Sequence, residues 1–333
     1  MRIVFSTGDI HGIGPEILMK SFLRLESEGH LLVAAGSFKA LEFYRDLLKL
    51  PVRLEPLADR SAIAHLKPEH GVLPVLSVEE PDTIVPGTVS KTAGTIAMHS
   101  LEAAAALCRD GICDALVTAP IHKEAIAIAG FSNTGHTDFL ASYFGVASPI
   151  MLFVDPVSTL KVALATIHVP LSRVASLIRS MDMVELFRSL AGSMQRDFGI
   201  LRPSIAVLGL NPHASDGGVM GDEEATLIRP SIEKLAGTLL IDGPFPADGF
   251  FGAKRYQDYD LVVAMYHDQG LLPFKVLAFD TGINVTLGLP IVRTSPDHGT
   301  GFDKAGKGTA SERSFYEATL LAAEIAQNRT KTF

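Results

Sequence analysis

The chain has only two cysteines among its 333 residues and no excess of basic side chains. Cys108 and Cys113 cannot form a disulfide framework, and we expect no metal site from these two thiols alone. A formal net charge of −8 argues against a nucleic-acid-binding protein, which would carry a basic stripe. A local cluster of Lys and Arg can still attract a small anionic substrate. These scarcities favour a reducing compartment and a small-molecule partner, with no nucleic acid.

Long apolar segments are also missing. No apolar run reaches the roughly 18–20 residues that a transmembrane helix needs, and residues 1–6 become polar too soon for a signal peptide. No internal repeat, low-complexity tract or linker rich in Pro, Gly and Ser interrupts the chain. We therefore expect a cytoplasmic protein with no membrane partner, long enough for two domains that crossing segments connect.

Short apolar segments alternate with helical periods along the whole chain. The expected strands are 3–6, 31–35, 115–118, 150–154, 162–167, 205–210, 261–265 and 283–286. The expected helices are 15–25, 92–107, 183–198, 223–235 and 311–326. Several strands lack polar alternation, which is typical of strands covered on both faces. The pattern predicts an α/β fold with a largely parallel sheet.

Three of these expected strands end in a histidine within a polar, turn-forming sequence: His168, His213 and His267. Ligands of open α/β sheets bind at the carboxyl ends of the strands. Imidazole is a common ligand for divalent metals, and three protein ligands leave a position open for substrate. The three histidines are therefore a candidate metal site, although each could instead be a capping or core residue.

Two glycine-rich segments are candidates for cofactor binding. The first joins the first strand to the first helix and contains Gly12 and Gly14; it matches neither a dinucleotide nor a triphosphate signature. The helix that follows offers unpaired N–H groups to an anion or a cofactor, but the glycines could equally serve packing. The second segment contains His298, Gly299, Thr300 and Gly306 and could enclose the adenosine end of a nucleotide or be a plain surface loop.

Other polar residues suit a phosphorylated, carboxylated small molecule. The candidate substrate contacts are His136 and Thr137, in a turn that opens a short helix, and Lys275, Asn284 and Arg293, in a segment expected to be rich in strands. Asp268 and Asp248 are candidates for a proton-accepting or ligand-orienting carboxylate. Each of these residues could instead be solvated or paired in an ion pair.

Longer motifs show a family resemblance. They cover residues 12–16, 119–123, 135–138, 210–214, 264–270, 284–290, 293–295 and 297–300. In this order they resemble the 4-hydroxythreonine-4-phosphate dehydrogenase family of pyridoxal phosphate biosynthesis, nearly from end to end. The first loop departs from the family pattern, because Ile10 and His11 stand where Pro and Ala are usual. Asp138, where glutamate is frequent, is a milder change.

The resemblance implies a two-domain α/β/α sandwich like isocitrate and isopropylmalate dehydrogenases, with the active-site cleft between the domains. We expect residues 1–125 and 285–333 in the first domain and 126–284 in the second. The family's metal ligands correspond to His168, His213 and His267, and its substrate contacts to the five residues proposed above. The resemblance also implies NAD as oxidant, with NADP left open, one Zn, Mg or Co ion per site, and a homodimer whose subunits share the site.

The implied reaction oxidises the C3 hydroxyl of 4-phosphooxy-L-threonine to a ketone. The resulting 2-amino-3-oxo-4-phosphooxybutanoate then loses carbon dioxide and gives 3-amino-2-oxopropyl phosphate. Oxidation of a related acid such as 4-phospho-D-threonate is an alternative that these motifs do not separate. A metal-dependent hydrolase that uses the same histidines to activate water is a second alternative. It would not need the nucleotide loop that the resemblance identifies near residues 293–308.

Overall fold

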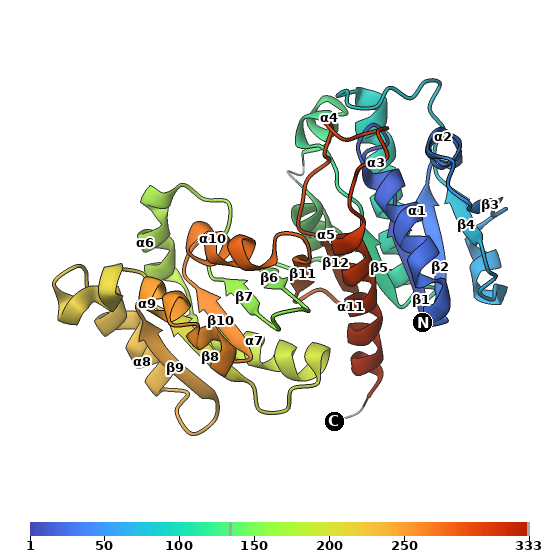
Figure 1. The fold of residues 1–333 in the computed structure, drawn as a ribbon. Coiled ribbons are helices and arrows are strands. Elements are labelled where there is room, and N and C mark those ends of the chain that lie inside the picture. Colours follow the sequence, from blue (N-terminus) through green and yellow to red (C-terminus); the bar gives the residue numbers. More distant parts are fainter. Residues whose placement is uncertain (133–134, 332–333) are drawn as a thin grey trace. The chain divides into compact units, whose positions relative to one another are not determined.

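The computed structural model describes residues 1–132 and 135–331 (Figure 1). The chain forms two compact units. Unit 1 contains Met1–Pro149 and Leu289–Lys331, and unit 2 contains Ile150–Gly288. Both contain a largely parallel sheet with helices, so the expected α/β class is confirmed. Among the described residues, no helix is long and apolar enough to cross a membrane.

Unit 1 contains a sheet of parallel strands. Their order is β3 (Arg53–Pro56), β4 (Val72–Ser77), β2 (Leu31–Gly36), β1 (Arg2–Ser6), β5 (Ala115–Thr118) and β12 (Val292–Pro296). Val4, Val33 and Leu116 point to one face and pack with apolar residues of α3 (Lys91–Arg109), α4 (Lys123–Ile128) and α5 (His136–Phe144). This single core holds the helices that carry two of the expected substrate contacts.

The opposite face of the unit 1 sheet is covered by α1 (Gly14–Leu25) and α11 (Arg313–Thr330), which lie side by side in Figure 1. Phe5 follows Val4 on β1 and so points to this face, where its ring meets Phe315 at 5.2 Å in an edge-to-face contact. Unit 1 also contains α2 (Phe38–Leu48) and two 3₁₀ turns, Glu26–Glu28 and Arg60–His65.

Unit 2 contains a mixed sheet. Its order is β11 (Ile283–Leu287), β6 (Ile150–Val154), β7 (Lys161–Leu164), β10 (Leu261–Ala264), β8 (Ser204–Leu208) and β9 (Leu240–Phe245). The strand β6 runs antiparallel to both neighbours, and the pairs from β7 to β9 are parallel. The carboxyl ends of β7, β10, β8 and β9 therefore meet at one edge of the sheet, where the candidate metal residues follow.

The helical elements of unit 2 pack around this sheet. They are α6 (Leu171–Ser180), α7 (Met183–Phe198), α8 (Arg229–Glu233), α9 (Ala247–Gly252) and α10 (His267–Ala278), with shorter turns at Pro212–Gly218, Glu224–Ile228 and Arg255–Asp258. Phe250 of α9 and Leu271 and Phe274 of α10 pack against Val162 and Val262 of the sheet. This core fixes α9 and α10 beside the strand ends.

Three sequence-based expectations differ from the structure. Residues 126–149, assigned to the second domain, belong to unit 1, because fully buried Leu140 of α5 packs in the same core as Leu116 and Ile126. Residues 285–288, assigned to the first domain, belong to unit 2, because β11 pairs with β6. The segment around Lys275 is not rich in strands but forms α10. Its buried residues Leu271, Phe274 and Ala278 recur at helical spacing, and this packing stabilises the helix despite Pro273.

Candidate active site

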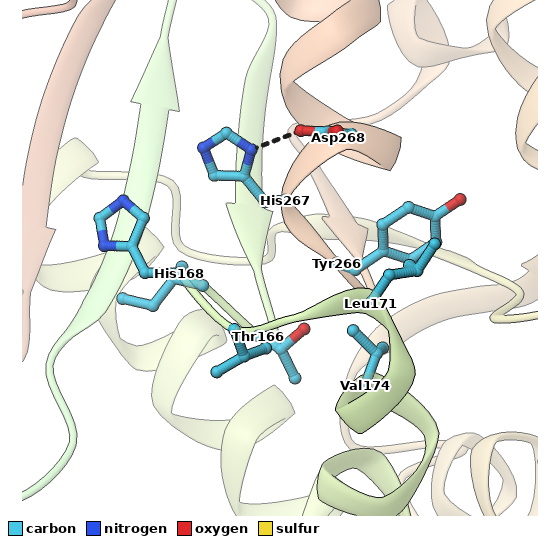
Figure 2. Close-up of a pocket in the computed structure, with 9 residues that line it drawn as sticks. Thr166, His168, Leu171, Val174, Tyr266, His267 and Asp268 are labelled. Atoms are coloured by element: carbon cyan, nitrogen blue, oxygen red, sulfur yellow. Dashed lines mark hydrogen bonds and ion pairs between the residues drawn. The ribbon is translucent and has the colours of Figure 1, made fainter.

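His168 and His267 lie next to each other at the carboxyl edge of the unit 2 sheet. His168 follows β7, and His267 begins α10 directly after β10. Their ring centroids are 5.8 Å apart, and both rings line a cavity of about 270 Å³ with Thr166, Leu171, Val174 and Tyr266 (Figure 2). The structure therefore brings together two of the three histidines expected to bind metal.

Asp268 holds the His267 ring in a defined tautomer. His267 Nδ1 lies 2.7 Å from Asp268 Oδ1, and because a carboxylate only accepts hydrogen bonds, Nδ1 carries the proton and donates it. Nε2 of a neutral His267 then keeps its lone pair for a ligand. This carboxylate–imidazole pair is the arrangement usual for a metal-binding histidine.

His213 lies in an adjoining cavity of about 280 Å³, which Asn211, Asp248 and Gln269 also line. Tyr266 lines both cavities. Within residues 1–132 and 135–331, no three His, Cys, Asp or Glu side chains are close enough together to hold a metal ion. The third histidine is thus near the other two but is not gathered with them.

The backbone at His213 has an unusual conformation. Five consecutive residues from His213 to Gly217 have φ angles of 55, 50, 74, 45 and 70°. Non-glycine residues in this left-handed region cost roughly 1–2 kcal/mol each. The segment after Asn211 therefore holds His213 in a conformation that local backbone preference opposes.

Two of the three expected imidazoles have the spacing that one shared divalent ion requires. Two imidazoles that bind one tetrahedral ion through nitrogen have ring centroids about 5–6 Å apart, from metal–nitrogen distances near 2.1 Å. His168 and His267 meet this condition. A third imidazole, that of His213, is available across Tyr266 on a strained segment. Uncharged nitrogen donors of this kind suit zinc or cobalt.

Asn211, two residues before His213, is held by two carboxylates that the sequence analysis did not single out. Its N–H and side-chain amide donate to Glu224 at 2.7 and 2.9 Å, and the amide also donates to Glu223 at 2.8 Å. Arg179 donates to Glu223 at 2.9 Å. The acidic pair at 223–224 in the sequence was the available clue, but nothing local linked it to Asn211.

In unit 1, His136 and Arg293 form a second group of expected substrate contacts. Arg293 on β12 is 3% exposed, and its Nε and Nη2 donate to Thr118 Oγ1 at 3.2 and 2.8 Å. Burial lowers the pKa of Arg293 to about 9. Burial, and then the charge of Arg293, lower the pKa of His136 well below its usual range. A neutral His136 donates from Nε2 to Ala119 O at 3.1 Å and presents Nδ1 as an acceptor.

The other expected substrate residues are in different surroundings. Thr137 follows His136 in the first turn of α5. Lys275 lies on α10, with its Nζ 6.0 Å from the centre of the Phe279 ring. Asn284 on β11 has a buried Oδ1 with no hydrogen-bond partner among the described residues. Lys275 and Asn284 belong to unit 2, whereas His136, Thr137 and Arg293 belong to unit 1.

The two candidate cofactor segments lie together within unit 1. Ile13 N donates to Thr300 O at 2.9 Å, and a Cβ on Gly12 would lie 2.8 Å from the same oxygen. Gly14 is equally restricted, since its Cβ would lie 2.4 Å from Thr7 O. Both glycines are buried, so they permit close packing of the loop. His298 and Gly299 are exposed beside it, and His298 Nδ1 lies 3.1 Å from Gly299 O.

Gly306 has a φ of 73°, and a Cβ on it would meet the Pro86 ring at 3.2 Å. His11, the departure from the family pattern, lies next to the same loop. It is 4% exposed, and its Nδ1 is 3.0 Å from Thr88 O. His11 therefore does not face solvent; it attaches the first loop to residues 86–88, against which the second segment packs. Asp138, the milder change, is exposed on α5.

Comparison with known proteins identifies the family of this chain. The family model described as pyridoxal phosphate biosynthetic protein PdxA matches residues 28–322, most of the chain. The chain belongs to this family. The resemblance drawn from the sequence motifs is therefore confirmed.

Relatives in the PdxA family match over nearly the full length. A protein named 4-hydroxythreonine-4-phosphate dehydrogenase from Prosthecochloris aestuarii is 60% identical over 331 residues, covering 98% of this chain and 97% of the relative. One of the same name from Acidithiobacillus ferrooxidans is 42% identical over 329 residues, with the same coverage. The crystal structure of 4-hydroxythreonine-4-phosphate dehydrogenase from Klebsiella pneumoniae is 34% identical, with a TM-score of 0.85 and coverage of 98% and 99%.

Proposed function

We propose that this chain is an NAD-dependent, divalent-metal-dependent 4-hydroxythreonine-4-phosphate dehydrogenase. It oxidises the C3 hydroxyl of 4-phosphooxy-L-threonine, and the product decarboxylates to 3-amino-2-oxopropyl phosphate. The observation that carries the proposal is the 60% identity to a relative of that name over 98% of the chain. The imidazoles and carboxylates at one edge of the unit 2 sheet agree with it.

His168, His213 and His267 would hold the metal. A divalent ion held there would supply Lewis-acid chemistry, lowering the pKa of a substrate hydroxyl and stabilising negative charge on its oxygen. Asp268 fixes the His267 ring so that Nε2 points away from the carboxylate. Asp248, exposed at the cavity that His213 lines, is the carboxylate with access to a substrate proton.

The oxidation removes one hydride and one proton from the substrate. The C3 hydride, with its electron pair, would pass to NAD, which the glycine-rich segments of unit 1 would hold and which would be reduced. The hydroxyl proton passes to Asp248, and C3 becomes a ketone. The β-keto acid would then lose its carboxyl group as carbon dioxide, and the electron pair left at C2 would take up one proton, which balances the proton that Asp248 accepted. The buried guanidinium of Arg293 is an apt donor for an anionic group of the substrate, because an arriving anion offsets the free energy of burying the charge.

We propose that a second copy of the chain completes the enzyme. On α10, Leu272, Val276 and Phe279 are 67, 77 and 77% exposed, and their spacing places them on one side of the helix. Contiguous apolar surface of this kind marks interaction sites. Because the same helix begins at His267 and carries Lys275, a partner covering it would lie next to the proposed metal and substrate residues.

The glycine-rich segments of unit 1 would bind the oxidant. His298, Gly299 and Thr300 are accessible beside the buried turn that contains Gly12 and Gly14. NADP remains an alternative oxidant. The two cysteines are unpaired and buried, which supports a reducing, cytoplasmic location.

A substrate panel tests the proposal. Purified protein with NAD and Zn²⁺, Mg²⁺ or Co²⁺ is given 4-phosphooxy-L-threonine or 4-phospho-D-threonate, and reduced nicotinamide and carbon dioxide are followed. We expect both products with the threonine compound, and none after chelation of the metal or in His213→Ala. Faster turnover of the threonate would favour the related activity. Hydrolysis of a phosphorylated substrate without nicotinamide reduction would favour a hydrolase.

A further inference from the structure

A chain of hydrogen bonds crosses the carboxyl edge of the unit 2 sheet and connects the ends of four strands. At its centre lies Met265, directly after β10. The backbone oxygen of Met265 accepts from Thr166 N at 3.2 Å and from Thr166 Oγ1 at 2.7 Å. Its N–H donates to Gln269 Oε1 at 2.7 Å. Thr166 follows β7, so this part of the chain connects β7 to β10.

Gln269 extends the connection to β8 and β9. Its Nε2 donates to Gly209 O at 2.6 Å, and Gly209 N donates to Phe245 O at 2.8 Å. Both ends of the amide are used, and the partners define its orientation, since Met265 N can only donate and Gly209 O can only accept. A glutamate at this position could not donate to Gly209, and an apolar residue could do neither.

Each bonded position lies a few residues before a proposed metal or proton-transfer residue. Thr166 and Met265 each lie two residues before a histidine, His168 and His267. Gly209 precedes His213 by four residues, and Phe245 precedes Asp248 by three. The bonds therefore fix the backbone just before each of these four residues. Thr166 is 6% exposed, so its bond is shielded from water.

We infer that Gln269 and Thr166 are positioning residues of the metal centre, fixing the separation of the strand ends that carry His168, His213 and His267. The inference rests on the proposed function. Neither side chain needs to bind the metal. Loss of either bond removes no histidine but lets the strand ends that position the histidines shift, and loss of groups that orient metal ligands weakens metal binding roughly 10- to 100-fold.

Binding of Co²⁺ alone tests the inference without substrate or NAD. Calorimetry gives the affinity, and visible absorption reports the geometry around the ion. We expect Gln269→Met, which keeps the length and removes both hydrogen bonds, to bind Co²⁺ roughly tenfold or more weakly and with an altered spectrum. Gln257→Met is the matched control, because Gln257 is exposed on another surface of unit 2; it should bind as the unaltered chain does.

Thr166 provides a test that does not depend on the Gln269 variant folding. Thr166→Val keeps the shape and loses the hydroxyl, whereas Thr166→Ser restores the hydroxyl. We expect the valine variant to bind Co²⁺ more weakly and the serine variant to bind it normally. A merely structural role would lower the melting temperature of the valine variant and leave Co²⁺ affinity, measured well below that temperature, unchanged.

The possible failures are distinguishable. Normal Co²⁺ affinity in both Gln269→Met and Thr166→Val would overturn the positioning role while leaving the metal centre intact. If the unaltered chain does not bind Co²⁺, or if His267→Ala binds it equally well, the metal centre itself is wrong and the inference falls with it.

Discussion

Replacing Arg293 should affect substrate turnover much more than it affects the free energy of unfolding. Its guanidinium is 3% exposed on β12, and burial lowers its pKa from its ordinary value to about 9. A shift of that size corresponds to roughly 5 kcal/mol by which burying the charge opposes folding. Against this stand two charge-assisted hydrogen bonds to Thr118 Oγ1, roughly 1.5–3 kcal/mol each. These two bonds offset much of that unfavourable free energy.

Replacing Arg293 by Met should therefore change the stability of the ligand-free protein little, by no more than about 2 kcal/mol. Substrate handling should respond strongly. Loss of one charge-assisted bond to an anionic group costs roughly 1.5–3 kcal/mol, which is a fall of roughly 10- to 150-fold in kcat/KM. Urea unfolding followed by circular dichroism gives the first quantity, and steady-state reduction of NAD gives the second.

Arg313→Met is the matched control for Arg293→Met, because Arg313 is exposed on α11. It should change neither unfolding nor turnover. The reasoning is refuted if Arg293→Met keeps normal kcat/KM. It is also refuted if the variant unfolds several kcal/mol more easily, since the buried charge would then be a net stabilising element of unit 1.

Three further predictions follow from packing, titration and the exposed face of α10. Gly94→Ala places a Cβ 2.2 Å from Ala125 O, between α3 and α4, and should destabilise the protein by about 1–3 kcal/mol in thermal unfolding. Gly192→Ala is the matched control in α7, where a Cβ would meet no atom within 4 Å, and it should stabilise the protein by about 0.5–1 kcal/mol. His136 takes up a proton near pH 6.5 when unfolded but only at lower pH when folded. Its contribution to stability is therefore complete above that pH and lost below it, so His136→Gln should lose less unfolding free energy between about pH 7.5 and about pH 5.5 than the unaltered chain does. Val276→Asp should shift the proposed dimer towards monomer in sedimentation, and sedimentation identical to that of the unaltered chain would count against α10 as the contact surface.

The sequence was sufficient to predict that three histidines follow strands at one edge of a sheet. His168, His213 and His267 each follow a short apolar run, and parallel strands bring such ends to one edge. Strands with weaker patterns were missed. β3 reads Arg-Leu-Glu-Pro, and β9 contains Gly243 and Pro244, residues that normally argue against a strand.

Features that depend on tertiary contacts could not be predicted. The left-handed run that begins at His213 has no glycine until Gly217, so local propensity opposes it. The hydrogen bond from Asn211 N to Glu224 joins residues that are 13 positions apart in the sequence. Gln269 stands inside a recognised motif, but its bond to Gly209 spans 60 residues and becomes visible only when β8 and β10 are neighbours.

Reduction of NAD by the purified chain in the presence of 4-phosphooxy-L-threonine and a divalent metal is the most direct test of the proposed function. We expect reduced nicotinamide and carbon dioxide in equal amounts. Chelation of the metal should abolish both products, and adding the metal back should restore them. Full turnover in the metal-free protein, or in His267→Ala, would contradict it.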